Sequence, residues 1–164
     1  RDLHSFPTRR SSDLSSPQPI EIINREIIEN LVRAGNIVIT AGGGGIPVYY
    51  DENDDLRTLD AVIDKDLASA LLASQIGANE FYILTDVSFI YKDFGLPTQE
   101  KLEFLNYADT VNYLESGTFS EGTMAPKIKA CLYFIKNGGE KSVITEAKKL
   151  EDKSYGSKIT MEYD

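Results

Sequence analysis

The feature of this sequence that most constrains its fold is an alternation of short apolar runs with longer segments of helical periodicity. The runs are rich in β-branched residues and have the length of buried strands, whereas the longer segments repeat apolar residues at three- and four-residue spacing. This alternation predicts the α/β class, as a mostly parallel sheet sandwiched by helices. The expected strands are 37–41, 81–85, 142–145 and a last edge strand 159–161, and the expected helices are 20–34, 67–76, 107–115 and 126–135.

The first fourteen residues differ in character from the rest of the chain. They are basic and serine-rich, have neither helical nor strand periodicity, and are too polar for a secretory signal peptide. We interpret residues 1–14 as a leader outside the fold, either a non-native fusion scar or a flexible native arm. Residues 15–164 are then expected to form one folded domain, since that length can bury a real core.

The overall composition argues against several classes of protein. The net charge of −9 argues against a nucleic-acid-binding surface, and no segment is long and apolar enough to cross a membrane. The single cysteine, Cys131, cannot form an intrachain disulfide and fits a reducing cytoplasm. One cysteine and one histidine, His4, cannot make a zinc site. We therefore expect a cytoplasmic protein that binds neither nucleic acid nor membranes.

Four consecutive glycines, at positions 42–45, follow the first expected strand. Without side chains, such a loop can approach a ligand closely and present backbone N–H groups to an anion. It is neither a Walker A loop, which needs Gly-Lys-Ser/Thr, nor a dinucleotide fingerprint, because Ile46 and Pro47 come next. The pattern alone fits either an anion-binding loop or a tight structural turn.

Two lysines lie at the starts of expected helices on the edge of the sheet where ligands bind. Lys65 lies between Asp64 and Asp66, which both stand where a helix N-cap belongs, and Asp66 can also hold the lysine ammonium. Lys127 follows Pro126, which fits the first position of a later helix. A cation is disfavoured at a helix N-terminus unless an anionic ligand is bound there. The pair indicates a site for a polyphosphate or a transferring phosphoryl group, and the alternative for each lysine is an ordinary surface position.

The second expected strand ends in Thr85 and Asp86, which also belong to this edge. The aromatic residues nearby are expected to be mostly core, with one lining an adenine pocket as the alternative; they are Tyr82, Phe89, Tyr91 and Phe94. Cys131 falls on an apolar helix face and is interpreted as packing. The acidic run 51–55 lacks the spacing of a calcium loop, so we expect a solvated hairpin or loop over 49–58.

Four segments resemble those of carbamate kinases in order and spacing, and the resemblance extends from about Ser15 to Ile159. GGGGIPV and AVIDKDLASALLA are specific to that family, whereas the other two segments also resemble the wider amino-acid kinase superfamily. The segments are 41–48, 61–73, 84–87 together with Tyr91, and 122–127.

The resemblance implies a role for each matched residue. Lys65 and Lys127 match lysines that neutralise phosphoryl oxygens, and Asp66 matches the carboxylate that orients them. Backbone near the carbamate and phosphate site is matched by Gly42, Gly43, Gly44 and Gly45. Nucleotide-pocket positions are matched by Thr85, Asp86, Val87, Tyr91, Met124 and Pro126. Family members use Mg²⁺ with ATP or ADP and hold the metal largely through phosphates and water, so no metal ligand is assigned here.

The resemblance further implies phosphoryl transfer between carbamoyl phosphate and ADP, or between ATP and carbamate in reverse, in arginine-deiminase-type catabolism. It implies a homodimeric parent whose N-terminal half, with its own strand and glycine-rich loop, has no counterpart in this chain. We therefore expect an amino-acid-kinase-like fold with an incomplete N-terminal half, which catalyses little alone. Two alternatives are a non-catalytic nucleotide-binding fragment and a sister amino-acid kinase, which GGGGIPV disfavours.

Overall fold

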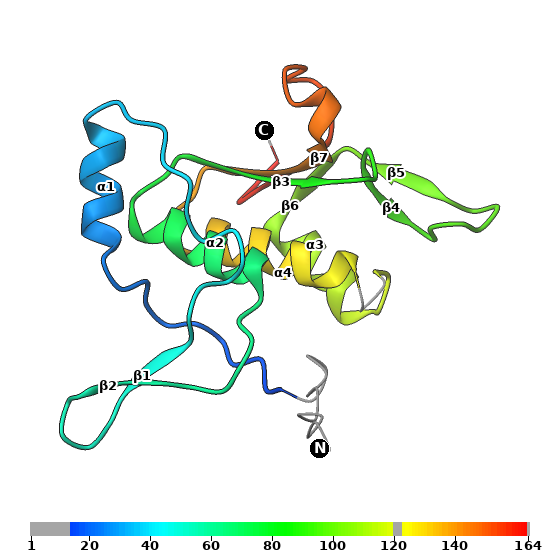
Figure 1. The fold of residues 1–164 in the computed structure, drawn as a ribbon. Helices are drawn as coiled ribbons and strands as arrows, with labels where there is room; N and C mark the ends of the chain where they lie inside the picture. The colour runs from blue at the N-terminus through cyan, green and yellow to red at the C-terminus, as the bar shows by residue number, and fades with distance from the viewer. Residues whose placement is uncertain (1–13, 120–122, 164) are drawn as a thin grey trace, which may run out of the picture.

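The computed structural model describes residues 14–119 and 123–163. Nearly all of the expected leader therefore lies outside the described residues, as does Gly122 of the last matched segment. Along the described chain, three antiparallel or mixed sheets and four α-helices are formed (Figure 1). None of these helices is long and apolar enough to span a membrane.

The centre of the fold is a four-stranded sheet with the strand order β3-β7-β8-β6. β3 is parallel to β7 and β8 is parallel to β6, while β7 and β8 are antiparallel. Two of the three neighbouring pairs are therefore parallel, as expected for a mostly parallel sheet. The strands are β3 (Glu80–Thr85), β6 (Phe104–Asn106), β7 (Lys141–Glu146) and β8 (Ser157–Thr160).

The helices α2 (Lys65–Gln75), α3 (Tyr107–Glu115) and α4 (Met124–Lys136) pack together on one face of this sheet (Figure 1). The opposite face carries the short 3₁₀ helix η2 (Ala147–Lys149) and the loop that follows it. The core lies between the sheet and the helices, where Ile128, Phe134 and Ile144 are completely buried. Close packing of this kind is what gives the sheet and helices a defined relative position.

The first expected strand is not formed, which corrects the prediction for 37–41. This segment has no strand assignment, and Ile37 and Ile39 are 97% and 99% exposed. A strand requires a neighbour to receive its backbone hydrogen bonds, and none of the described residues pairs with this segment. An apolar sequence alone therefore does not make it a strand.

The helix preceding this segment is also shorter than expected. α1 spans Arg25–Arg33 rather than 20–34. It starts after Asn24, whose backbone is left-handed and whose side chain does not cap the helix. Ion pairs from Glu21 to Arg25 and from Glu29 to Arg33 support its surface. No residue of α1 is buried, so the apolar face that predicted the helix is left open to solvent.

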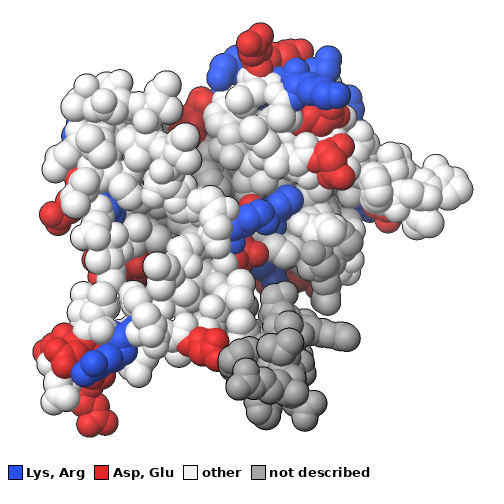
Figure 2. All heavy atoms as spheres, viewed as in Figure 1, with Lys and Arg blue, Asp and Glu red and all other residues white. Residues whose placement is uncertain are grey.

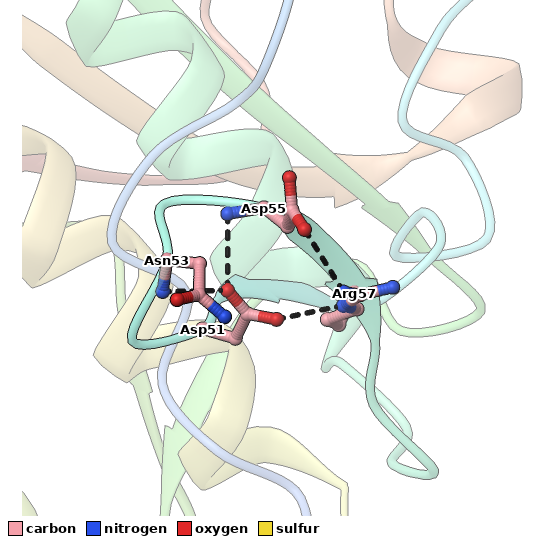
Figure 3. A network of polar contacts seen from close by, with 4 residues as sticks. All are labelled: Asp51, Asn53, Asp55 and Arg57. Atoms are coloured by element: carbon pink, nitrogen blue, oxygen red, sulfur yellow. Dashed lines mark hydrogen bonds and ion pairs between the residues drawn. The ribbon is translucent and has the colours of Figure 1, made fainter.

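The acidic run forms the tip of a hairpin, as expected, between β1 (Val48–Tyr50) and β2 (Leu56–Thr58). Figure 3 shows how Asp51 organises it by accepting the N–H groups of Asn53 and Asp55. The Arg57 guanidinium donates to Asp51 at 2.8 Å and to Asp55 at 3.0 Å. The hydrogen bond from Arg57 is the main cause of the lowered pKa of Asp51. A second hairpin, β4 (Ile90–Lys92) with β5 (Glu100–Leu102), projects from the body.

Two further expectations are corrected by the topology. β8 is an interior strand between β7 and β6, not an edge strand, because β6 pairs with its outer side. Pro126 is the third residue of α4 and not the first. A strand's own sequence does not determine which strands lie beside it. The N–H groups in the first turn of a helix have no acceptors within the helix, so proline is tolerated anywhere in that turn.

Ile144 is buried in the core and Ile39 is exposed, so their replacement by alanine should have different effects on stability. Ile144→Ala should lower the free energy of unfolding by about 2–5 kcal/mol, because it leaves a cavity between β7 and α4. Ile39→Ala should change it by less than about 0.5 kcal/mol, because that side chain is in solvent. Urea unfolding of both variants measures this, and a large cost at Ile39 would show that 37–41 is buried in solution.

Candidate active site

The chain connections bring the starts of two helices to one edge of the sheet. α2 leads into β3 and α4 leads into β7, so each helix runs back along the strand that follows it. Because β3 and β7 are parallel, the N-termini of both helices lie at the edge where these strands end (Figure 1). Helix N-termini carry partial positive charge and unpaired N–H groups, so this edge is suited to an anion.

Asp64 fixes the start of α2. Its Oδ1 accepts the backbone N–H groups of Asp66 and Leu67, both at 2.9 Å. Of the two residues expected at the N-cap, Asp64 is therefore the cap, and the expectation that Asp66 can cap the helix is corrected. The reason is geometric, since a capping side chain must stand before the helix to reach its first N–H groups. The Asp66 carboxylate is thereby left available for other partners.

Asp66 joins the two lysines that the sequence singled out. Its Oδ2 lies 2.9 Å from the Nζ of Lys127 and 3.7 Å from the Nζ of Lys65. The side chains of Asp66 and Lys127 are only 12% and 16% exposed, whereas that of Lys65 is 59% exposed. The structure thus brings all three residues together, with one ammonium held in place and one reaching into solvent.

The charges of this cluster are arranged so that an anion can be bound. Two ammonium groups and two helix N-termini lie around the Asp66 carboxylate, and the nearby Asp64 carboxylate is engaged as the cap of α2. α4 has no acidic residue in its first turn. A phosphoryl group placed here would receive charge-assisted hydrogen bonds.

The glycine loop lies against the segment that leads into this cluster. Gly44 is buried, and a Cβ at that position would collide with the carbonyl oxygen of Ile63, just before the helix cap. Gly42, Gly43 and Gly45 are exposed, with open space around them. The Gly44 N–H donates to the carbonyl of Ala41 at 3.1 Å in a tight turn. The loop is therefore a tight structural turn packed on Ile63, and its role in binding an anion stays a prediction.

The expected nucleotide positions lie further along the same edge. The Thr85 hydroxyl donates to Asp86 at 3.1 Å just beyond β3, and Val87 follows. The Tyr91 ring lies 5.8 Å from that of Phe94 and 6.5 Å from that of Phe89. Within the described part of the chain, no hydrogen bond links these residues to the lysine cluster. These residues therefore lie at the same edge of the sheet as the lysine cluster without being hydrogen-bonded to it.

Met124 and Pro126 occupy the first turn of α4, both partly buried. They therefore stand beside Lys127 at the helix start, as their sequence positions require.

One residue at this edge of the sheet was not predicted from the sequence. Glu146 ends β7 opposite Thr85 and accepts a hydrogen bond from Ser88. The signal was available, because Glu146 follows an apolar run just as Asp86 does.

Cys131 lies one helical turn after Lys127 in α4 and is completely buried. Burial raises the pKa of its thiol to about 12, which fits the packing role expected from the sequence. Among the residues with described positions, no group of three or more histidine, cysteine, aspartate or glutamate side chains is arranged to hold a metal ion.

Comparison with known proteins identifies the family. A sequence model of the amino acid kinase family matches residues 1–146. This chain belongs to the amino acid kinase family. The predicted amino-acid-kinase-like α/β fold is also confirmed by a solved carbamate kinase from Giardia lamblia bound to AMP-PNP, which superimposes with a TM-score of 0.86 at 31% identity. That match covers 92% of this chain and 56% of the Giardia chain.

Curated members of the amino acid kinase family include close sequence relatives of this chain. A carbamate kinase from Halobacterium salinarum is 42% identical over 151 residues, or 86% of this chain and 49% of its own length. One from Thermoplasma volcanium is 48% identical over 130 residues, or 79% and 42% of the two lengths. The chain thus spans about half the length of the curated relatives it matches.

The packing of the glycine loop predicts different costs for two neighbouring substitutions. Gly45→Ala should cost about 1–2 kcal/mol of stability, because its φ of +86° is strained for any residue with a Cβ. Gly44→Ala has the same strain at φ +88° and should cost about 1–3 kcal/mol more, because its Cβ would collide with Ile63. Denaturant unfolding measures both, and equal losses would mean that the loop does not pack on Ile63.

The burial of Cys131 predicts slow reaction with thiol reagents. With a pKa of about 12, only a fraction on the order of 10⁻⁴ of the thiol is ionised near pH 8. The native protein should react with dithionitrobenzoate only as fast as it opens, whereas chain unfolded in guanidinium chloride should react at once. As the sequence has one cysteine, the released colour reports on Cys131 alone. Rapid reaction of the native protein would contradict its burial.

Proposed function

We propose that this chain is the nucleotide-binding part of a carbamate kinase, which transfers a phosphoryl group between carbamoyl phosphate and ADP. The observation that carries the proposal is the cluster in which Asp66 holds the Lys127 ammonium at 2.9 Å and lies 3.7 Å from that of Lys65. The names of the relatives from Halobacterium salinarum and Thermoplasma volcanium supply the substrate class.

In the proposed reaction, a terminal phosphate oxygen of ADP attacks the phosphorus of carbamoyl phosphate, and the bond from phosphorus to the carbamate oxygen breaks. Carbamate leaves as an anion, and in the reverse direction it is already a nucleophile, so no general base is required. The protein therefore has to position the reactants and stabilise charge on the transferring group. Lys65 and Lys127 are proposed to contact its oxygens, with Asp66 as the positioning residue for both.

The remaining site residues are proposed to hold the reactants around this centre. Gly42, Gly43, Gly44 and Gly45 would present backbone to the carbamate and phosphate end of the substrate. The nucleotide would bind along the edge formed by Thr85, Asp86, Val87, Tyr91, Met124 and Pro126. Support for a nucleotide comes from the helix N-termini at this edge and from the AMP-PNP bound to the Giardia relative.

Mg²⁺ is proposed to accompany the nucleotide and to be held mainly by its phosphates. The donor set fits this arrangement, because the one carboxylate in the cluster, Asp66, is engaged by two ammonium groups. When bound, the metal would add further charge stabilisation to the phosphates. The lysines of this chain would still provide the contacts to the transferring group from the protein side.

The wider setting of the enzyme is also a proposal. Carbamate and carbamoyl phosphate would be its small-molecule partners, its full-length form would be a cytoplasmic homodimer, and it would act in arginine-deiminase-type catabolism. The acidic net charge of −9 favours partners other than nucleic acids. A sister amino-acid kinase is less well supported, because the curated relatives described above are both carbamate kinases.

The activity can be tested with a chimera that joins this chain to the portion of the Halobacterium salinarum relative that it does not cover. ATP formation from ADP and carbamoyl phosphate, coupled to hexokinase, should be readily measured in the chimera. The chain alone should bind ADP weakly and turn over little, because part of the substrate cradle is absent from it. Activity of the chimera on acetylglutamate or UMP but not on carbamoyl phosphate would refute the assignment.

Within that chimera, Lys127→Ala should lower kcat by about 10²–10³-fold and weaken ADP binding much less. The ammonium acts where charge is redistributed in the transition state, and this is the scale for removing one such donor. Lys127→Arg should not restore the rate fully, because a planar guanidinium cannot replace a compact ammonium.

Lys129→Ala is the matched control, because Lys129 is exposed on the same helix two residues later. It should leave kcat unchanged. If Lys127 were an ordinary surface residue, Lys127→Ala would also leave kcat unchanged and would raise the melting temperature slightly, since a cation is removed from the positive end of a helix. Steady-state kinetics and thermal unfolding of both variants distinguish these outcomes.

A further inference from the structure

A cavity of about 230 Å³ lies at the far edge of the central sheet from the candidate active site. It is lined by residues of β6, β7 and β8 and of the C-terminal segment: Phe104, Lys141, Lys158, Thr160 and Tyr163. Lys141 begins β7, whereas Glu146, at the active-site edge, ends it. These two positions are five residue steps apart along the strand, or about 16 Å. The cavity is thus a separate feature of the fold.

The two lysines of this cavity differ in the groups that lie against their ammonium groups. Lys141 pairs with Glu80 at 2.6 Å. Lys158 is half-buried on an interior strand, and its Nζ stands 4.9 Å from the centre of the Phe104 ring. Among the described residues, no carboxylate forms an ion pair with Lys158. Asp152 interacts with Lys158 only at longer range: the pKa of that carboxyl group is lowered mainly by hydrogen bonds from Ser154 and to a smaller extent by the charge of Lys158. An ammonium that lies against an aromatic face without a close ion pair can gain from a neighbouring anion.

Two aromatic rings form the apolar part of the cavity. Phe104 is 63% exposed and Tyr163 is 58% exposed, although both are large rings. The Tyr163 hydroxyl donates to Asp109 at 2.6 Å, which anchors the ring and occupies a carboxylate that would otherwise repel an anion. Large exposed rings held in place beside lysines are suited to a flat apolar group that carries a negative charge.

A second, smaller hollow adjoins this cavity and shares Lys141 and Lys158 with it. Thr145 is one of its lining residues; it is only 2% exposed, and its buried hydroxyl has no hydrogen-bond partner among the described residues. Its volume of about 10 Å³ accommodates roughly one water molecule. A buried hydroxyl without a partner is costly, so a polar guest in this hollow would be stabilising.

We infer that this cavity binds a small anion with a flat apolar body. The acidic group, a phosphate or a carboxylate, lies between Lys141 and Lys158, and the flat body lies against Phe104 and Tyr163. The volume suits a molecule of single-ring size and is too small for a whole nucleotide. Because the cavity is remote from Lys127, its occupancy is independent of phosphoryl transfer.

Phenyl phosphate is a probe with both required parts, and it can be titrated into the chain itself by calorimetry and by ¹H–¹⁵N NMR. It should bind more tightly than inorganic phosphate or phenol, each of which offers only one part. Benzoate then tells whether a carboxylate replaces the phosphate. The amide signals that shift should be those of 104, 141, 158 and 160–163, and those of 85–87 and 127 should stay in place.

Lys158→Ala should weaken phenyl phosphate binding by about tenfold or more, the scale of one charge-assisted contact. Lys129→Ala, on the helix-covered side of the sheet, should leave it unchanged. Phe104→Leu provides a second variant at an exposed position and should remove the advantage of phenyl phosphate over inorganic phosphate. Unshifted free-protein spectra show that each variant is folded. Equal affinity in Lys158→Ala, no saturable binding, or shifts confined to 85–87 and 127 would each overturn the inference.

Discussion

The ion pair between Asp66 and Lys127 is the interaction on which the candidate site depends. It joins two helices through residues that are sixty-one positions apart in sequence, and it does so at the point where both helices present unpaired N–H groups. A partly buried pair of this kind adds little net stability, because desolvation offsets the attraction between the charges. Its value lies in orientation: the carboxylate holds one ammonium still and keeps the second nearby.

That pair can form only because other contacts place the two helix starts. Asp64 caps α2, so the Asp66 carboxylate is not needed as the cap. Buried residues of α2 and α4 pack together over the sheet, with Ala70 and Ala130 fully buried. The parallel pairing of β3 with β7 then sets both helix starts at the same edge. Remote packing therefore determines the position of the charges, as is usual for sites on rigid elements.

The sequence predicted those elements whose signals are local. α3 was expected over 107–115 and has those bounds, because its periodicity and the polar residue before it define it completely. β3 begins one residue before its predicted run, and β7 extends one residue beyond its run at each end, because the polar residues there still pair between the strands. The segment 37–41 and the position of β8 were wrong, because a strand's existence and its place in a sheet depend on partners that its own sequence does not contain.

The site followed the same division between local and distant information. Lys65, Asp66 and Lys127 were singled out from their helix positions, and their contact follows from topology. The division of labour between Asp64 and Asp66 depends on where the helix begins to within two residues, which periodicity does not resolve. Glu146 and the cavity at Lys158 were missed, since each becomes noticeable only when strands from distant parts of the chain lie side by side.

The contrast between a cationic cluster and an acidic molecule has a consequence for how ligands arrive. The chain carries a net charge of −9, so at long range it repels anions, which the lysine cluster is proposed to attract at short range. Salt acts mainly on the long-range part, since charges separated by more than a Debye length of about 8 Å at physiological ionic strength are largely screened. Moderate ionic strength would therefore lower the barrier to encounter while leaving much of the attraction inside the cluster intact. The association rate of a nucleotide with this surface would then rise with moderate salt, whereas it falls for proteins whose whole surface steers anions inward.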